Sequence, residues 1–99
     1  MKKYYEIGKY KVFLTKSVYN TTGNTAINAI CLDKIPYGTL TVNLIPLEHK
    51  ELAYLNINLF GLDVEKFIVE NGLGKKIDGR ECQSGYLVYP LYKLNLEKI

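Results

Sequence analysis

The sequence is poor in the residues that build metal and redox sites. It holds two cysteines, one histidine and no tryptophan among 99 residues. The cysteines, Cys31 and Cys82, form no Cys-x-x-Cys pair. A structural zinc site needs about four thiolate or imidazole ligands, so Cys and His alone cannot assemble one within this chain. The sequence therefore predicts no metal site and no cofactor.

Long apolar runs are also missing. No segment approaches the ~20 consecutive apolar residues that a membrane helix needs. The Met-Lys-Lys start is followed by Tyr4, Tyr5 and Glu6, where a signal peptide would carry an apolar segment. We expect a cytoplasmic protein with no membrane contact, in which both cysteines are free thiols.

The bulk composition is that of an ordinary globular protein. Hydrophobic residues make up 47% of the chain and charged residues 23%. These fractions do not match those of disordered chains. A length of 99 residues predicts one domain that covers residues 1–99.

Alternation of apolar and polar residues predicts strands along most of the chain. An apolar residue at every second position is typical of a half-buried strand. The predicted strands cover residues 9–19, 25–32, 39–45, 53–60 and 86–96, with Pro90 interrupting the last one. A turn is predicted at residues 35–38, and a loop with a short strand near 76–78 is predicted within residues 74–85.

The period changes to that of a helix at residues 63–71. Asp63 is the predicted N-cap, and the apolar residues Val64, Phe67 and Ile68 share one helical face. Asn71 and Gly72 are typical of a helix end. The predicted fold is therefore α+β: one antiparallel sheet of five or six strands, with this short helix packed on one face.

The positive charge is concentrated near the N-terminus. Residues 1–20 contain five lysines and one glutamate. Edge-protecting lysines on a solvated strand explain this pattern, and so does a surface that binds nucleic acid. For the second interpretation the candidate residues are Lys9, Tyr10 and Lys11. Lys2, Lys3, Tyr4 and Tyr5 extend this candidate surface.

Tyrosine is the most unusual component, with nine residues. Tyrosines suit sheet packing, but tyrosine and arginine are also preferred anchors in protein interfaces. Tyr86, Tyr89 and Tyr92 surround Pro90, and Arg80 lies nearby in the sequence. We predict Arg80, Tyr86, Tyr89 and Tyr92 as a protein-binding patch.

Cys82 is the third candidate, as a catalytic nucleophile. A reactive thiolate needs a base, usually a histidine. His49 is the only histidine, and no sequence feature orients it toward Cys82. We therefore expect a protein that is not an enzyme.

The C-terminal third contains Asn71-Gly72-Leu73-Gly74, Gly79-Arg80, Ser84-Gly85, Tyr89-Pro90-Leu91-Tyr92, Leu94 and Asn95. With these segments, and more loosely with residues 37–44, the chain resembles a small family of uncharacterised proteins encoded on conjugative transposons and phages of Gram-positive bacteria. The resemblance implies that the protein is an accessory protein of a mobile genetic element, and it implies no biochemical activity.

Three functions follow, in order of preference. The first is a non-enzymatic module that binds an unknown protein partner. The second is a nucleic-acid-binding protein, and the third is a cysteine-dependent enzyme. The sequence leaves open whether the chain is a monomer or a homodimer, since a long edge strand can pair two copies.

Overall fold

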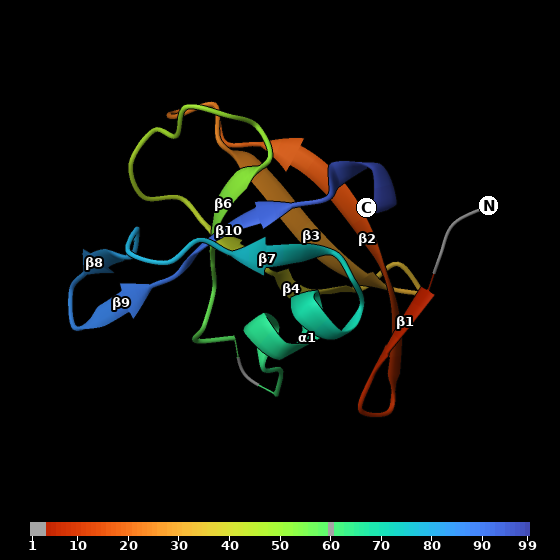
Figure 1. Cartoon of the computed structure of the whole chain (residues 1–99). Helices are drawn as coiled ribbons and strands as arrows, with labels where there is room; N and C mark the ends of the chain where they lie inside the picture. Colours follow the sequence, from red (N-terminus) through yellow and green to blue (C-terminus); the bar gives the residue numbers. More distant parts are fainter. Residues whose placement is uncertain (1–3, 60) are drawn as a thin grey trace.

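A computed structural model describes residues 4–59 and 61–99, and these residues form ten strands and one α-helix (Figure 1). Every strand pair is antiparallel. Sheet A has the order β1 (Tyr4–Ile7), β2 (Tyr10–Val18), β3 (Thr25–Cys31) and β4 (Pro36–Thr39). Sheet B has the order β5 (Thr41–Val42), β6 (Leu52–Leu55), β10 (Leu91–Leu94) and β7 (Gly74–Lys76). Sheet C contains β8 (Cys82–Ser84) and β9 (Leu87–Tyr89). The helix α1 covers Val64–Glu70, and a 3-10 turn, η1, covers Leu96–Lys98.

The predicted combination of antiparallel strands with one α-helix is confirmed, but the prediction of a single sheet of five or six strands is wrong. The reason lies at Leu40 and Thr41, which we call the Leu40–Thr41 joint. The segment 39–45 was predicted as one strand, yet β4 ends at Thr39 in sheet A and β5 begins at Thr41 in sheet B. The chain therefore changes sheets within one alternating segment.

Hydrogen bonds hold the Leu40–Thr41 joint to both sheets. The Leu40 N–H donates to the Ile27 carbonyl oxygen at 2.8 Å, and the Ile27 N–H donates to Thr41 Oγ1 at 3.2 Å. On the other side, the Asn56 N–H donates to the Leu40 carbonyl oxygen at 2.8 Å. Leu40 is completely buried. The joint thus satisfies its buried polar groups while it redirects the chain.

The central strand predicted at residues 25–32 is confirmed, because β3 lies between β2 and β4. The turn predicted at 35–38 is wrong: β4 begins at Pro36, and the turn precedes it. Lys34 has a φ of 71°, and the Asp33 carboxylate accepts a hydrogen bond from the Ile35 N–H at 3.2 Å. Pro36 fits the start of an edge strand, where its missing N–H costs no ladder bond.

The fourth predicted strand, 53–60, is shorter in the structure, because β6 ends at Leu55. The Asn56 side-chain amide donates to the Thr39 carbonyl oxygen at 3.1 Å, so this side chain is bonded to the end of β4. Phe60 lies outside the described residues. The short strand predicted near residues 76–78 lies instead at Gly74–Lys76, where it forms β7, and the strand β8 was not predicted.

The helix prediction is confirmed at both ends. The Asp63 side chain accepts a hydrogen bond from the Lys66 N–H at 3.1 Å, as an N-cap does. Gly72 has a φ of 66° and donates to the Val69 carbonyl oxygen, and the Leu73 N–H donates to the Ile68 carbonyl oxygen at 2.9 Å. This pair of bonds is the Schellman motif that ends a helix at glycine.

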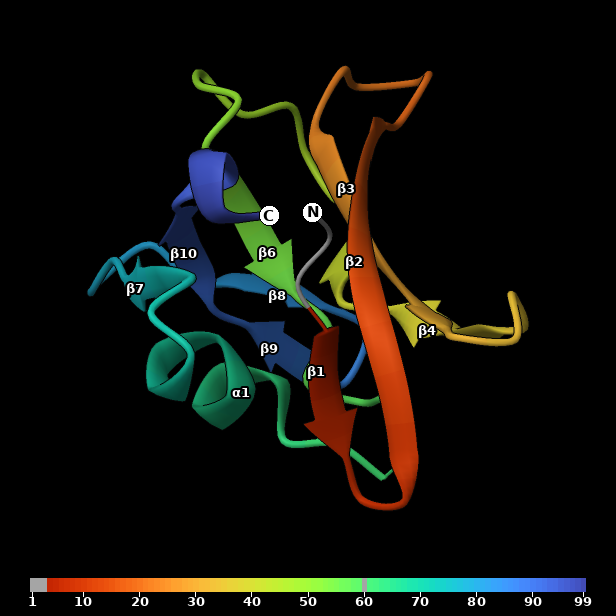
Figure 2. The ribbon, with the colours of Figure 1, turned by 90° about the vertical axis from the view of Figure 1, so that its right-hand side faces the viewer.

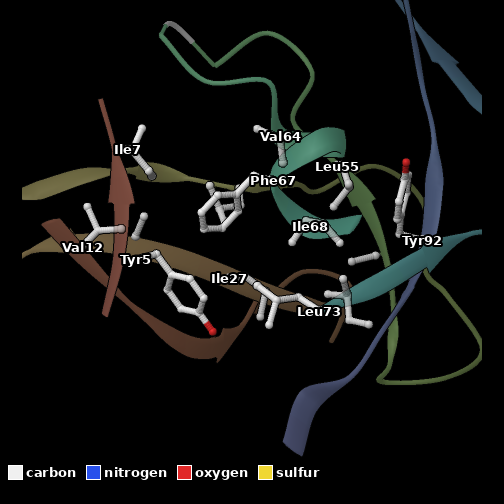
Figure 3. Packing of buried hydrophobic residues seen from close by; sticks show 14 residues of the cluster. Tyr5, Ile7, Val12, Ile27, Leu55, Val64, Phe67, Ile68, Leu73 and Tyr92 are labelled. Carbon is white, nitrogen blue, oxygen red and sulfur yellow. The ribbon is translucent and has the colours of Figure 1, made fainter. Parts of the chain in front are cut away.

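One core lies between sheets A and B, and α1 closes one end of it (Figure 2). Figure 3 shows Phe67 of α1 among side chains from β1 and β3, and its ring centroid lies 5.4 Å from that of Tyr5. The main cluster includes Tyr5, Ile7, Val12, Ile27, Leu40, Ala53, Leu55, Val64, Phe67, Ile68, Leu73, Tyr92 and Leu94. Sheet B also buries its other face, where Leu52, Tyr54 and Leu91 form a second cluster.

The last predicted strand is divided at Pro90 into β9 and β10, as the proline predicted. The Pro90 carbonyl oxygen still accepts a hydrogen bond from the Leu55 N–H at 3.1 Å. β9 therefore belongs to sheet C, whereas β10 is a central strand of sheet B. No helix among the described residues is long and apolar enough to span a membrane.

Gly74 provides a test of the packing between β7 and β10. A Cβ added at Gly74 would lie 2.7 Å from the Lys93 carbonyl oxygen, a backbone atom that cannot move independently. We expect Gly74→Ala to lower the free energy of unfolding by about 1–3 kcal/mol, as overpacking does. At Gly38 the nearest atom, at 2.8 Å, is the end of the Leu59 side chain, which can rotate. Gly38→Ala is therefore the matched control, and urea unfolding should show the smaller loss for it. Equal losses would contradict the packing described for Gly74.

Candidate functional site

The β8–β9 hairpin extends away from the two large sheets (Figure 1). Ser84 pairs with Leu87, which leaves the two-residue loop of Gly85 and Tyr86. Gly85 has a φ of 63°, and Tyr86 has no positive φ, as a tight type II′ turn requires. Tyr86 is fully exposed, and Val88 is 50% exposed. The hairpin thus holds apolar groups in solvent on a short turn.

The base of the hairpin is anchored to the body. Cys82 pairs with Tyr89, and both half-buried side chains pack against the second cluster on sheet B. Arg80 Nη2 donates to Glu48 Oε1 at 3.1 Å, which ties the entry of the hairpin to the loop before β6. This hydrogen bond holds the pKa of Glu48 below its usual value. The base is therefore fixed, whereas the tip is free.

Tyr92 does not lie on the surface. Its side chain is only 3% exposed, within the main cluster, and its hydroxyl donates to Glu65 Oε1 at 2.8 Å. Burial first, and then the hydrogen bond to Glu65, raise the pKa of Tyr92 well above its usual value. Strand alternation explains the position, since Tyr92 and Leu94 face the core while Lys93 between them faces solvent.

The structure therefore divides the patch predicted from Arg80, Tyr86, Tyr89 and Tyr92. Tyr86 is available for a partner, Tyr89 is half-buried, and Arg80 is exposed but paired with Glu48. Tyr92 must be removed from the patch because it is part of the core. Val88 is the exposed neighbour that the sequence did not suggest.

The basic N-terminal candidates lie at the end of sheet A. Lys9 Nζ lies 5.6 Å from the ring centroid of Tyr10, and the Tyr10 ring packs edge to face on Tyr37 at 5.8 Å. Hollows of about 500 Å³ and 310 Å³ lie beside Tyr10, and Cys31 and Ile35 line both of them. Lys9 and Tyr10 are thus brought together, and Lys11 lines the smaller hollow.

The remaining N-terminal candidates do not share that surface. Tyr5 is 6% exposed and packs on α1, so it cannot contact nucleic acid. Tyr4 lies on the opposite face of sheet A from Tyr10, because its partner Phe13 is three residues from Tyr10 and strand residues alternate between faces. Lys2 and Lys3 lie outside the described residues.

Cys82 and His49 show no catalytic contact within the described part of the chain. The Cys82 thiol lies 3.8 Å from the carbonyl oxygen of its neighbour Gln83, and His49 is exposed. No hydrogen bond joins the thiol to the imidazole in residues 4–59 and 61–99. The same residues contain no group of three or more His, Cys, Asp or Glu side chains placed to hold a metal ion.

Sequence reasoning missed one surface, the outer face of sheet A. Phe13 was an apolar residue on the polar side of the alternation in β2. It contacts Tyr4 there, with ring centroids 6.4 Å apart. A single aromatic residue on a polar strand face was the signal that could have identified this surface.

The buried Tyr92 hydroxyl predicts a specific pH dependence. At neutral pH we expect Tyr92→Phe to cost about 1 kcal/mol, because the bond to Glu65 is lost. Above about pH 10, tyrosine ionises in the unfolded state, while the raised pKa keeps folded Tyr92 protonated. The wild type therefore loses stability as the pH rises through this range, whereas the phenylalanine variant does not lose this contribution.

The measurement is urea unfolding of both proteins from neutral pH to above about pH 10. The difference between wild type and Tyr92→Phe should shrink as the pH rises. Tyr86→Phe is the control, since this residue is exposed, and it should leave the midpoint unchanged. A difference that stays constant across the range would contradict the buried, protonated state of Tyr92.

A comparison of the chain with known protein families and proteins finds a match to one family. No curated protein and no solved structure matches the chain. Residues 12–99 match the profile of a family described as a domain of unknown function (DUF4313). The match includes nine of the ten strands, α1 and the β8–β9 hairpin, and it leaves out only β1 and the start of β2. The chain therefore belongs to this family, the domain of unknown function DUF4313.

Proposed function

We propose that the protein is a non-enzymatic module that binds a protein partner through the tip of the β8–β9 hairpin. The observation that carries the proposal is the full exposure of Tyr86 on a two-residue turn whose base is fixed. Tyrosine supplies a large contact area with few rotatable bonds, so its ordering on binding costs little. The binding surface is Tyr86 and Val88 at the tip, with Arg80 at the base.

The geometry supports a hairpin that is already in its binding conformation before a partner arrives. Sheet C makes its ladder hydrogen bonds only between β8 and β9, so its tip residues are not needed by sheets A and B. The anchor at Cys82 and Tyr89 limits the motion of the base. A rigid element that presents an aromatic side chain loses little entropy when a partner pocket encloses it.

The biological setting is also part of the proposal. The resemblance to proteins of conjugative transposons and phages supports an accessory role in a mobile genetic element. The partner is then a protein of the element or of the host cell, met in the cytoplasm.

The test is a capture experiment followed by a measured affinity. Wild-type protein, Tyr86→Ala and Tyr10→Ala are used to capture proteins from a lysate of the cells that encode the chain. We expect one partner to be lost with Tyr86→Ala and retained with Tyr10→Ala. With the purified partner, Tyr86→Ala should weaken binding by about 2 kcal/mol, or roughly 30-fold, as loss of a central aromatic anchor does.

A partner that binds Tyr86→Ala as tightly as wild type would refute the role of the hairpin. Thermal unfolding provides the control for folding. Because Tyr86 is fully exposed, its replacement should leave the midpoint unchanged.

A further inference from the structure

Two lysines face each other at the edge of sheet B. The register pairs Lys75 of the edge strand β7 with Lys93 of β10. Opposed residues of an antiparallel pair share a face, so the two side chains leave the sheet on the same side. Like charges placed directly opposite each other destabilise a sheet. The packing of the fold therefore gives no reason for this lysine pair.

The charges of the lysine pair are not neutralised within the described part of the chain. Lys75 and Lys93 are exposed, and the ion pairs formed by residues 4–59 and 61–99 involve other side chains. The C-terminus of α1 does not explain the pair either. The last turn of α1 contains no basic residue, and its carbonyl groups accept hydrogen bonds from the backbone of residues 71–73. The two ammonium groups are therefore available to an anion.

A hollow of about 390 Å³ lies at this lysine pair, within the size range of small-ligand sites. Besides the two lysines, it is lined by Gly72, Gly74, Leu94 and Asn95. The glycines contribute only backbone, so no side chain fills the space beside them. The Asn95 side chain is exposed and caps no backbone group of η1, so its amide N–H groups can donate to a ligand.

A third lysine lies at the rim of the hollow. Lys98 is the last residue of η1, the turn that follows β10. Its Nζ atom lies 3.3 Å from the position that a Cβ would take at Gly72, one of the glycines that line the hollow. Strands β7 and β10 and the turn η1 thus bring three ammonium groups and one amide to the same place, although they are far apart in the sequence.

We propose that this hollow binds the phosphate group of a small phosphorylated molecule. The phosphate lies between Lys75 and Lys93, with Lys98 at the rim, and the Asn95 amide donates to a phosphate oxygen. A phosphate monoester carries a charge of about −1.5 to −2 at pH 7, so one ligand offsets the repulsion between the opposed lysines. The hollow shares no residue with the β8–β9 hairpin, so the inference is independent of the proposed protein partner.

The shape of the site favours a phosphate monoester over other anions. A carboxylate carries one charge and leaves the lysine pair partly unneutralised. A nucleic-acid strand spreads its charges along an extended backbone, whereas these lysines surround one hollow. Leu94 gives the hollow an apolar wall that can contact the organic part of a phosphorylated ligand. Free phosphate shares the chemistry of the phosphate group but not this contact.

The experiment is thermal unfolding of the full-length protein with phenyl phosphate, with inorganic phosphate, and with sodium chloride at equal ionic strength. A ligand that binds only the folded state raises the unfolding midpoint. We expect phenyl phosphate at about ten times its dissociation constant to raise the midpoint by roughly 5–10 °C over sodium chloride. Inorganic phosphate at the same concentration should raise it less. An equal rise would identify free phosphate as the ligand and overturn the proposal of a phosphorylated molecule.

Lysine variants test the contacts of the opposed pair. Without phosphate, Lys75→Gln and Lys93→Gln should leave the midpoint unchanged or raise it, because each relieves the repulsion between like charges. With phenyl phosphate, each should weaken binding by about fivefold, so the rise in midpoint falls to about half. Lys11→Gln removes an exposed lysine of sheet A, changes the net charge equally and is the matched control, which should keep the whole rise.

Three further results would overturn the proposal. The first is no rise in midpoint with phenyl phosphate, and the second is an equal loss of the rise in Lys11→Gln and Lys93→Gln, which would indicate unspecific attraction to net charge. The third is tighter binding of an oligothymidine than of phenyl phosphate, which would assign the lysines to a polyanion. Tyr86→Ala should keep the whole rise, so failure of this inference and failure of the hairpin proposal can be told apart.

Discussion

The structure depends on the hydrogen bonds that hold the Leu40–Thr41 joint. Leu40 donates to β3, accepts a bond from the segment after β6, and is completely buried between the two sheets. Thr41 accepts from the backbone of the same β3 residue, Ile27, and also contacts the Tyr19 hydroxyl at 3.0 Å. Two four-stranded sheets can share one core here because the chain crosses between them without an unpaired polar group. The helix then closes the space that remains at one end.

The arrangement of the two sheets decides which surfaces remain exposed to solvent. Sheet B buries side chains on both of its faces, since the second cluster lies on the face that the main core does not use. Sheet A is buried on one face only, so Tyr4 on its other face stays 55% exposed. The β8–β9 hairpin comes before β10 in the chain, and Pro90 separates it from sheet B. The surfaces that stay in solvent are therefore those that neither core cluster covers.

The sequence predicted those features of the fold that depend on only a few neighbouring residues. Asp63 and Gly72 ended the helix where the sequence indicated, because caps depend on only a few neighbouring residues. The alternation in residues 39–45 was real, but alternation does not tell which sheet a strand joins, and so the change of sheets at Leu40 was invisible. Tyr92 shows the same limit at the candidate site. Its neighbours suggested a surface patch, whereas the register with β6 and β7 turns it toward Glu65 and the core.

The separation of the hairpin from the ladders of both large sheets has a consequence for sequence variation. The residues from Gln83 to Val88 belong to neither core cluster, and only Cys82 and Tyr89, at the base of the hairpin, pack against one. Substitutions at Tyr86 or Val88 can therefore change the chemistry of the exposed tip while the cost in folding stays small. Selection can act on the exposed side chains of this hairpin almost independently of stability, because the rest of the fold does not depend on them.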